Sequence, residues 1–297
     1  MIIYFDNGSN PFTKYINESG YRCISPYNNK YKVKFIRILE KYNFPKLYIY
    51  NRFVVDKDEI IIVFDSNISK EYLEWLKKNY IKNRIIFWYW NPVHTTLQPD
   101  QIPKGIEKWS YSLSDCKKYK LKYNTTFFFD IYNRDTQKIK LKQKKAIFIG
   151  RDKGRLDKLL YLKNELEKEG IICEIHIIGN PKKIIDGLNQ YYEKIMTYDK
   201  VIDLIKKSDF IIDIYTDIYA GLSLRPMEAI FFNKILITNS KLIKEYDFFD
   251  SKLIYIIGDN KITLSNFLKN CVEDRQYMNV NYYTINSWYK RFSEGMK

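Results

Sequence analysis

Hydrophobic positions in the first half of the chain form short apolar runs separated by longer amphipathic segments. The runs at residues 1–5, 59–65 and 84–90 are rich in β-branched and aromatic residues, which is typical of buried strands. Between them, residues 30–43 and 69–81 carry apolar residues at helical spacing, with Ser69 placed to cap the second segment. The stretch 108–130 is less regular.

The second half shows the same alternation more cleanly. Strands are predicted at 145–150, 174–179, 210–215, 234–239 and 253–258, and helices at 155–170, 199–209, 226–233 and 263–270. Gly170 stands where a left-handed residue would end the first of these helices. Alternation of this kind predicts the α/β class, with a parallel sheet covered by helices on both faces. On such sheets, ligands bind beyond the carboxyl ends of the strands.

The chain length and one charged stretch predict the domain organisation. A chain of 297 residues suggests about two domains of roughly 150 residues each. The charged segment 138–145 precedes a new strand and marks the expected boundary. We therefore predict a first domain over 1–142 and a second over 143–275. A C-terminal helix within 276–297 is expected to cross back towards the first domain.

Composition excludes several classes of protein. With 45% hydrophobic and 29% charged residues, the chain can bury a core and is not a disordered or collagen-like protein. Its four cysteines form no C-x-x-C pair, so neither a zinc site nor a disulfide framework is expected. We expect no signal peptide at the N-terminus and no membrane-spanning segment, and hence a cytoplasmic protein.

The net charge of +15 is unevenly distributed. Residues 1–150 hold 27 basic and 14 acidic residues, whereas residues 151–297 hold 23 and 21. The 17% aromatic content adds to a composition often found in nucleic-acid-binding proteins, although an AT-rich genome would also raise the tyrosine count. No recognisable DNA- or RNA-binding motif is present, so we expect no nucleic-acid partner. The uneven charge indicates that the two halves have different partners.

The first candidate loop is residues 150–155, Gly-Arg-Asp-Lys-Gly-Arg, between a predicted strand and a predicted helix. A helix start offers unpaired N–H groups and partial positive charge, and Gly150 would let the backbone approach a ligand closely. Arg151, Lys153 and Arg155 add three cations. The pattern favours a phosphate-binding loop over an exposed basic turn, although it does not match a P-loop.

The second candidate loop is residues 221–229. Pro226 suits the first turn of a helix, which would leave the N–H groups of Leu224 and Arg225 facing whatever precedes that helix. Glu228, one turn further on, could accept two vicinal hydroxyls such as those of a ribose. A carboxylate that merely stabilises the helix dipole is the simpler alternative. Together with the first loop, the pattern favours a nucleotide-binding site.

Taken together, FIGRDKG, SDFIIDIY, GLSLRPMEAI and KILITN resemble the donor-binding half of a GT-B fold glycosyltransferase. The resemblance covers residues 145–275 and implies two Rossmann-like domains facing a cleft. It implies that Arg151 and Lys153, beside Gly150, contact the diphosphate of a nucleotide-sugar. It further implies that Gly221, Ser223, Leu224 and Arg225 cradle diphosphate and sugar, that Glu228 holds the ribose, and that the loop 196–198 with Tyr198 lines the base.

The whole chain, including 87–92 and 109–124, is similar to small glycosyltransferases of bacterial lipopolysaccharide and capsular polysaccharide synthesis. This implies transfer of a hexosyl group from a UDP- or GDP-linked sugar, bound by the second domain, to a glycan or glycolipid bound by the first. Many retaining members carry a glutamate eight positions before the equivalent of Glu228, where this chain has Ala220. Retention or inversion therefore stays open.

An inverting transfer needs a base near the incoming hydroxyl. Asp6, Asp65 and His94 each follow a predicted strand in the first domain, and each could equally be an ordinary turn or surface residue. Asp65 and His94 are the preferred candidates. The other histidine, His176, alternates into a predicted strand and is expected in the core.

Two further motifs have simple structural interpretations. Trp88, Tyr89 and Trp90 could stack against a sugar, but a place in the strand core is favoured. Asp56–Lys57–Asp58 matches an Asp-x-Asp metal motif only formally, because it lies in a charged loop. We expect neither a metal nor a cofactor beyond the nucleotide-sugar, since cations and a helix start could neutralise the leaving diphosphate.

Two alternatives concern what the chain does and where it acts. The basic, aromatic first half could dock on the anionic inner face of the cytoplasmic membrane and meet a lipid-linked acceptor there. A catalytically inactive GT-B homologue that serves as a partner subunit is the other alternative, ahead of a nucleic-acid-binding protein.

Overall fold

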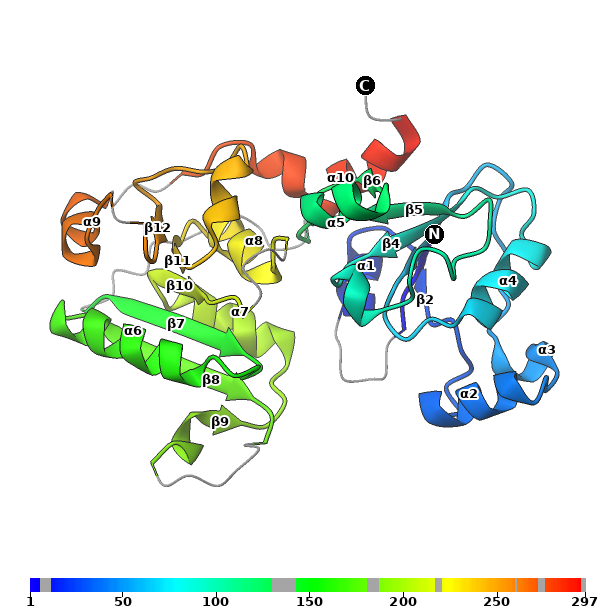
Figure 1. Cartoon of the computed structure of the whole chain (residues 1–297), viewed down its shortest axis with the longest axis horizontal. Coiled ribbons are helices and arrows are strands. Elements are labelled where there is room, and N and C mark those ends of the chain that lie inside the picture. The colour runs from blue at the N-terminus through cyan, green and yellow to red at the C-terminus, as the bar shows by residue number, and fades with distance from the viewer. Residues whose placement is uncertain are drawn as a thin grey trace. The chain divides into compact units, whose positions relative to one another are not determined.

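A computed structural model describes residues 1–5, 12–129, 143–180, 187–216, 221–259, 261–271 and 276–294. The chain divides into two compact units (Figure 1). The first unit comprises Met1–Ile131 with Ile285–Lys297, and the second comprises Tyr132–Thr284. The expected boundary at residue 142, Asp6 and Ala220 all lie outside the described residues. Each unit holds a six-stranded parallel sheet with helices, which confirms the predicted α/β class with two Rossmann-like units.

The sheet of the first unit has the strand order β2-β1-β3-β4-β5-β6. Every neighbouring pair of strands is parallel. The order 2-1-3-4-5 belongs to the doubly wound α/β sheets. The strands are β1 (Ile2–Ile3), β2 (Cys23–Ile24), β3 (Ile61–Phe64), β4 (Ile85–Tyr89), β5 (Glu107–Ser110) and β6 (Lys122–Tyr123).

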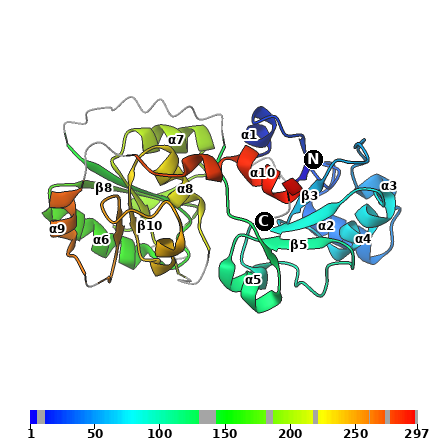
Figure 2. The same ribbon diagram turned by 90° about the horizontal axis from the view of Figure 1, so that it is seen from above.

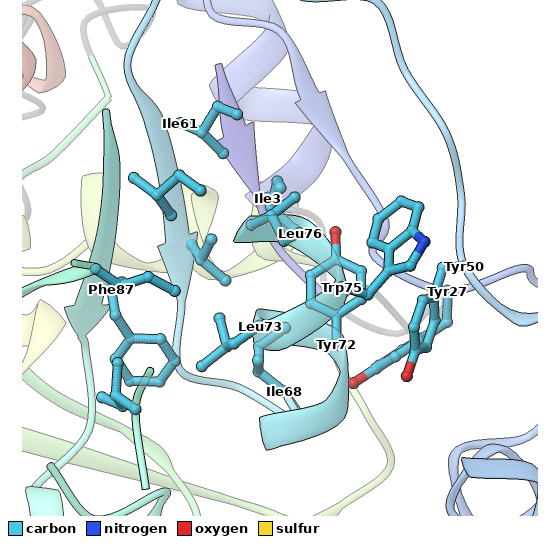
Figure 3. Close-up of a cluster of buried hydrophobic side chains, with 14 of the residues drawn as sticks. Ile3, Tyr27, Tyr50, Ile61, Ile68, Tyr72, Leu73, Trp75, Leu76 and Phe87 are labelled. Carbon is cyan, nitrogen blue, oxygen red and sulfur yellow. The ribbon is translucent and has the colours of Figure 1, made fainter. Parts of the chain in front are cut away.

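One face of this sheet packs against three helices, α2 (Val33–Lys41), α3 (Lys46–Ile49) and α4 (Lys70–Asn79). Alternate residues of β3 and β4 point into that core, where α4 contributes Tyr72, Leu73 and Leu76 (Figure 3). The Ser69 side chain accepts a hydrogen bond from the Tyr72 N–H, which confirms the predicted cap of α4.

The opposite face is covered by α1 (Phe12–Glu18) and by the C-terminal helix α10 (Ile285–Glu294) (Figure 2). Trp288 of α10 is fully buried, and its ring centroid lies 5.4 Å from that of Trp88. The Asn124 side-chain amide also donates to the Trp288 carbonyl at 3.1 Å. Trp88 and Tyr89 have no exposed surface, so the strand-core interpretation holds for both.

The irregular stretch 108–130 contains short elements that the hydrophobic pattern does not indicate. They are β5, α5 (Leu113–Tyr119) and β6. None of the α5 residues is buried, so the helix has no apolar stripe to reveal it. Its ends are set locally instead, by the Ser112 side chain as N-cap and by Lys120 in the left-handed conformation.

The sheet of the second unit has the strand order β12-β11-β10-β7-β8-β9. In chain order this is the 3-2-1-4-5-6 arrangement of the dinucleotide-binding Rossmann fold. All pairs are parallel. The strands are β7 (Lys145–Gly150), β8 (Ile172–Ile178), β9 (Tyr192–Glu193), β10 (Phe210–Asp213), β11 (Ile235–Thr238) and β12 (Ile254–Ile256).

Helices pack on this sheet through apolar stripes. α6 (Leu156–Lys168) and α9 (Leu264–Asn270) share one core with alternate strand residues. α7 (Tyr198–Lys206) contacts β7, and α8 (Leu224–Phe231) contacts β10 and β11. The described residues also form short 3-10 helices, η1 (Val93–Thr95) in the first unit and η2 (Asn189–Tyr191), η3 (Lys241–Glu245) and η4 (Val280–Tyr283) in the second.

Two predictions about single residues of the second unit have opposite outcomes. Gly170 ends α6 with φ of 76°, and its N–H donates to the Glu167 carbonyl, which confirms the predicted left-handed end. The core position expected for His176 is wrong. Residues of β8 alternate between buried and half-buried positions, and His176 takes a half-buried one, where its Nδ1 contacts Glu193 of β9.

Candidate functional site

The second unit has a topological switch point between β7 and β10. These strands are neighbours, but β8 lies beyond β7 on one side and β11 lies beyond β10 on the other. The loops that leave β7 and β10 therefore diverge and leave room between them, which is where open α/β sheets bind ligands. Both candidate loops of the sequence belong to this place, since one follows Gly150 and the other follows Asp213.

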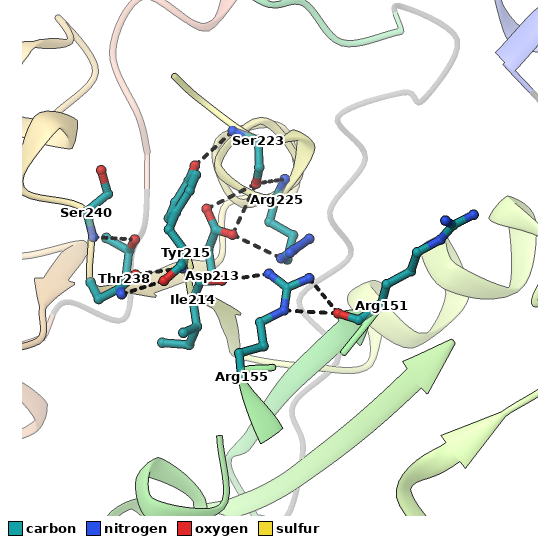
Figure 4. Close-up of polar contacts among 10 residues, drawn as sticks. Arg151, Arg155, Asp213, Ile214, Tyr215, Ser223, Arg225, Thr238 and Ser240 are labelled. Carbon is teal, nitrogen blue, oxygen red and sulfur yellow. Dashed lines mark hydrogen bonds and ion pairs between the residues drawn. The ribbon is translucent and has the colours of Figure 1, made fainter. Parts of the chain in front are cut away.

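Arg155 connects the two loops (Figure 4). Its Nη1 donates to the Ile214 carbonyl at 2.6 Å, and its Nε and Nη2 donate to the Arg151 carbonyl at 3.0 and 2.7 Å. The residue is only 6% exposed. All three hydrogen bonds end on neutral carbonyl oxygens, so they hold the guanidinium in place without cancelling its positive charge.

Arg225 brings a second guanidinium to the same place. Its Nε lies 3.1 Å from an oxygen of buried Asp213. The guanidinium carbons of Arg155 and Arg225 lie 4.9 and 5.0 Å from the centroid of the Phe148 ring. A Cβ on Gly150 would come within 3.4 and 3.5 Å of their terminal nitrogens. The two arginines thus converge beside a residue whose missing side chain leaves them room.

Burial and the crowding of like charges lower the pKa of two cations at this place. Burial, followed by the nearby charge of Arg225, lowers the pKa of Arg155 to about 10. Burial and the charges of Arg155, Arg225 and Arg151 lower the pKa of Lys153. An anion bound among these groups would relieve their mutual repulsion. We call Lys153, Arg155 and Arg225 the cation cluster, whereas the exposed Arg151 side chain points away from both other arginines (Figure 4).

The loop after Gly150 offers side chains rather than a bare helix start. The Asp152 carboxylate accepts hydrogen bonds from the N–H groups of Arg155 and Leu156 at 3.1 and 3.2 Å. Those N–H groups were expected to face a phosphate. Lys153 and Gly154 turn the chain with φ of 51° and 75°. The loop can therefore bind an anion mainly through its cationic side chains.

The second loop is also held by internal bonds. α8 begins at Leu224, two residues before the expected start, because Ser223 serves as N-cap and accepts from the Arg225 N–H at 3.2 Å. The Ser223 hydroxyl contacts both Asp213 oxygens at 3.1 Å. The backbone N–H of Ser223 donates to the Tyr215 hydroxyl at 2.8 Å. These contacts fix the position of Arg225.

Glu228 and Tyr198, both predicted to bind the donor, lie together. The Tyr198 hydroxyl donates to Glu228 Oε1 at 2.8 Å, although the two residues come from different helices. Glu228 is 5% exposed, and burial raises its pKa to about 7. Gly221 is buried and Leu224 is half-buried at the start of the same helix.

Sequence reasoning missed Asp213 and Tyr215, which organise this site. Asp213, at the end of β10, is 1% exposed. Tyr215 is held by the Asn239 side chain, which accepts from the Tyr215 N–H and donates to the Tyr215 carbonyl. One signal was available, because an acidic residue interrupts the apolar run FIIDIY. A buried charge needs a partner, and here that partner is Arg225.

The first unit has a pocket at the carboxyl ends of β3 and β4. Its volume is about 440 Å³. Most of its lining side chains are polar, and the residues are Asp65, Ser66, Asn67, Ile68, Asn91, Thr95, Thr96, Leu97 and Gln101. Hydroxyl and amide groups of this kind suit a ligand with many hydroxyls.

Asp65 is the buried carboxylate of this pocket. The residue is 3% exposed, and Asn91 donates to its two oxygens from the backbone N–H at 3.0 Å and from the side-chain amide at 2.9 Å. Burial nevertheless raises the pKa of Asp65 to about 7. A carboxylate with this pKa can accept a proton at neutral pH.

The other candidate base, His94, has a different environment. His94 is exposed within η1 and does not line the pocket. Asp56 and Asp58 are exposed beside a turn, as expected for a loop. Within the described ranges, no three His, Cys, Asp or Glu side chains are grouped so as to hold a metal ion.

No protein-family model matches this chain, and no curated protein matches it. Among solved structures, the chain is similar to a crystal structure of the GtfA/B complex bound to UDP and GlcNAc, with 12% sequence identity and a TM-score of 0.30. The match covers 80% of this chain and 55% of that chain, so the chain spans about half of its length. A likeness at this score carries no inference about activity. The strand orders themselves define two Rossmann-like α/β units.

Proposed function

We propose that this protein is a glycosyltransferase that moves a hexosyl group from a UDP- or GDP-linked sugar to a hydroxyl of a glycan acceptor. One observation carries the proposal. The guanidinium groups of Arg155 and Arg225 converge beside Gly150 at the switch point of a Rossmann-like unit. This is the place where such a fold binds the phosphates of a nucleotide.

The cation cluster is assigned to the diphosphate. When the bond between the anomeric carbon and the phosphate oxygen breaks, negative charge develops on the leaving diphosphate. Preorganised cations stabilise that charge most strongly where burial has already removed water. Arg155 and Arg225 meet this requirement, with Lys153 at the rim, and the proposed reaction therefore needs no metal.

Glu228 and Tyr198 are assigned to the nucleoside. A glutamate one turn into α8 can accept hydrogen bonds from vicinal ribose hydroxyls, while Tyr198 lies beside the base. Since Tyr198 already donates to Glu228 at 2.8 Å, binding would replace or share that bond. This exchange gives the nucleotide a direct effect on the ionisation of Glu228.

The pocket of the first unit is assigned to the acceptor, and Asp65 to the base of an inverting transfer. Asp65 would take the proton of the acceptor hydroxyl while the oxygen of that hydroxyl bonds to the anomeric carbon. The raised pKa of Asp65 makes the carboxylate a stronger base than an exposed aspartate. The acceptor class we propose is a bacterial surface glycan of the lipopolysaccharide or capsule type.

A thermal-shift panel of UDP, GDP, CMP and dTDP, each with and without its sugars, tests the donor assignment. We expect one nucleotide family to raise the melting temperature, and Arg225→Gln to reduce that rise. Lys158→Gln is the matched control, because Lys158 is an exposed cation on α6. No stabilisation by any nucleotide would contradict the proposal.

Turnover separates an enzyme from an inactive homologue. Incubation with the bound nucleotide-sugar and a panel of glycan acceptors should release the nucleotide diphosphate, and Asp65→Asn should slow the release strongly. Binding without any release would instead favour the inactive partner subunit.

A further inference from the structure

Large apolar side chains are exposed on one part of the first unit. Among the described residues, 13 large hydrophobic side chains are exposed, and seven of them lie within residues 35–54. We call these seven the α2–α3 patch: Phe35, Ile38, Tyr42, Phe44, Leu47, Tyr48 and Val54. Exposed apolar residues that gather on one part of a surface mark a place that binds a protein, a ligand or a membrane.

The patch follows from the periodicity of α2. Phe35, Ile38 and the adjoining Tyr42 are spaced at i, i+3 and i+7, so they form one stripe along the helix. They are 47%, 50% and 76% exposed, whereas Ile36 and Glu40 on the other side are buried. α3, which contacts α2, extends the surface, and the rings of Phe44 and Tyr48 lie 6.0 Å apart.

Within residues 30–54, the segment that carries the patch, the exposed charges have one sign. Residues 30–54 contain seven basic residues and one acidic residue. That acid is Glu40, which is buried and bonded to Arg37 at 2.8 Å, so it faces away from water. The exposed charges are all positive and are carried by Lys30, Lys32, Lys34, Lys41 and Arg52.

We propose that the α2–α3 patch binds the surface of an anionic lipid bilayer. An amphipathic helix with aromatic and aliphatic residues on its outer face and lysines at its flanks suits the headgroup region. Protein–protein interfaces, in contrast, are depleted of lysine. The described helices are all too short or too polar to span a bilayer, so the binding is peripheral.

The inner side of α2 is bonded to the pocket of the first unit. Arg37 Nη2 donates to the Asn67 carbonyl at 2.7 Å, and the Ser69 hydroxyl donates to Glu40 at 2.6 Å. Asn67 lines the pocket, and Ser69 follows Ile68, which also lines it. A bilayer-bound α2 would therefore hold this pocket near the lipid surface. The consequence, a lipid-linked acceptor, rests on the proposed function, whereas the bilayer binding does not.

Vesicle flotation tests the proposal. Vesicles of phosphatidylcholine alone are compared with vesicles containing about a third phosphatidylglycerol, each at low and high salt. The intact chain is expected to bind the anionic vesicles, and to bind them more weakly at high salt. Both Phe35→Ser/Ile38→Ser/Tyr42→Ser and Lys34→Gln/Lys41→Gln should weaken that binding by roughly tenfold or more.

Matched controls come from the second unit. Tyr161→Ser/Ile195→Ser/Met278→Ser removes three exposed apolar side chains, and Lys158→Gln/Lys269→Gln removes two exposed cations. Both controls should bind anionic vesicles like the unsubstituted chain. Equal binding by the patch variants, or equal salt-independent binding to both vesicle types, would overturn the proposal.

Two further measurements make the result specific. Sedimentation velocity without lipid tests whether the patch is instead a protein interface. Dimerisation of the intact chain that is lost in Phe35→Ser/Ile38→Ser/Tyr42→Ser would overturn the proposal. Thermal shifts with the nucleotide should be the same for the patch variants and the intact chain. Loss of vesicle binding with retained nucleotide binding separates this proposal from that of the donor site.

Discussion

The two units differ in the charged groups at the carboxyl edges of their sheets. The second unit gathers arginines around buried Asp213, whereas in the first unit the amide groups of Asn91 bond the buried carboxylate of Asp65. Burial moves both towards neutrality, because it lowers the pKa of Arg155 to about 10 and raises the pKa of Asp65 to about 7. The fold thus provides the location, and the residues after each strand decide whether it suits an anion or a proton.

The units also differ in net charge, though less than the halves of the sequence. The first unit holds 24 basic and 14 acidic residues, and the second holds 26 and 21, which gives +10 and +5. The difference narrows because the basic stretch 138–145 falls in the second unit. The positive charge of the first unit is therefore better described locally, by the exposed basic residues within residues 30–54.

The largest expected effect is that of Asp65→Asn. The amide keeps the size of the side chain but cannot accept the proton, so transfer should slow by roughly 10²- to 10⁴-fold. The transfer rate of the unsubstituted chain should rise with pH through about 7, because the proposed reaction uses the ionised form of Asp65. Steady-state rates from pH 5 to 9 measure this. Asp100→Asn, at an exposed aspartate, is the control, and an unchanged rate in Asp65→Asn would exclude this base.

Glu228→Gln tests the buried carboxyl of the second unit through stability. An unfolded glutamate ionises near 4.5, whereas Glu228 ionises at about 7 in the fold. The folded state therefore holds a proton that the unfolded state has lost, and stability falls as pH rises between these values. From pH 5 to 8, the unsubstituted chain should lose about 2–3 kcal/mol more than Glu228→Gln.

Urea unfolding at several pH values measures this difference in stability. Asp65 contributes equally to the pH dependence of both chains, so its contribution cancels. Glu245→Gln, at an exposed position, should behave like the unsubstituted chain. Parallel curves for Glu228→Gln and the unsubstituted chain would show that Glu228 is not the titrating group.

Arg225→Gln removes one of the two converging guanidinium groups. Loss of a charge-assisted hydrogen bond should weaken nucleotide diphosphate binding by roughly 10- to 50-fold, measured by calorimetry. The change also leaves buried Asp213 without its ion-pair partner, which would lower stability by itself. Asp213→Asn/Arg225→Gln should recover stability but not affinity. Recovery of both would mean that Arg225 only neutralises Asp213.

Lys153→Ala is expected to have the smallest effect. Lys153 is only partly buried and keeps contact with water, so a bound diphosphate would gain little from it in the ground state. Its contribution should appear as charge develops on the leaving group, and turnover should fall severalfold with little change in KM. A rise in KM at constant kcat would instead assign Lys153 to substrate binding.

Much of the fold could be predicted because it depends on local patterns. The strands around residues 61–64 and 85–89 and the cap at Ser69 follow from side-chain periodicity and backbone chemistry. α5 could not be found in this way, since it buries none of its residues. The core position expected for His176 failed because the period of a strand does not reveal which face is covered.

For the candidate site too, some features could be predicted from the sequence and others could not. By itself, the sequence determined the α/β alternation, the two loops after Gly150 and Asp213, and the candidates Asp65 and His94. These depend on residues that are close in the chain.

Only the tertiary structure decided that Arg155 and Arg225 converge, that Tyr198 bonds Glu228, and that Asp65 lines a pocket. Strand order determines which distant loops become neighbours, and burial determines which charges lose their water. Both depend on how the whole chain packs, and the spacing of residues along the chain contains neither.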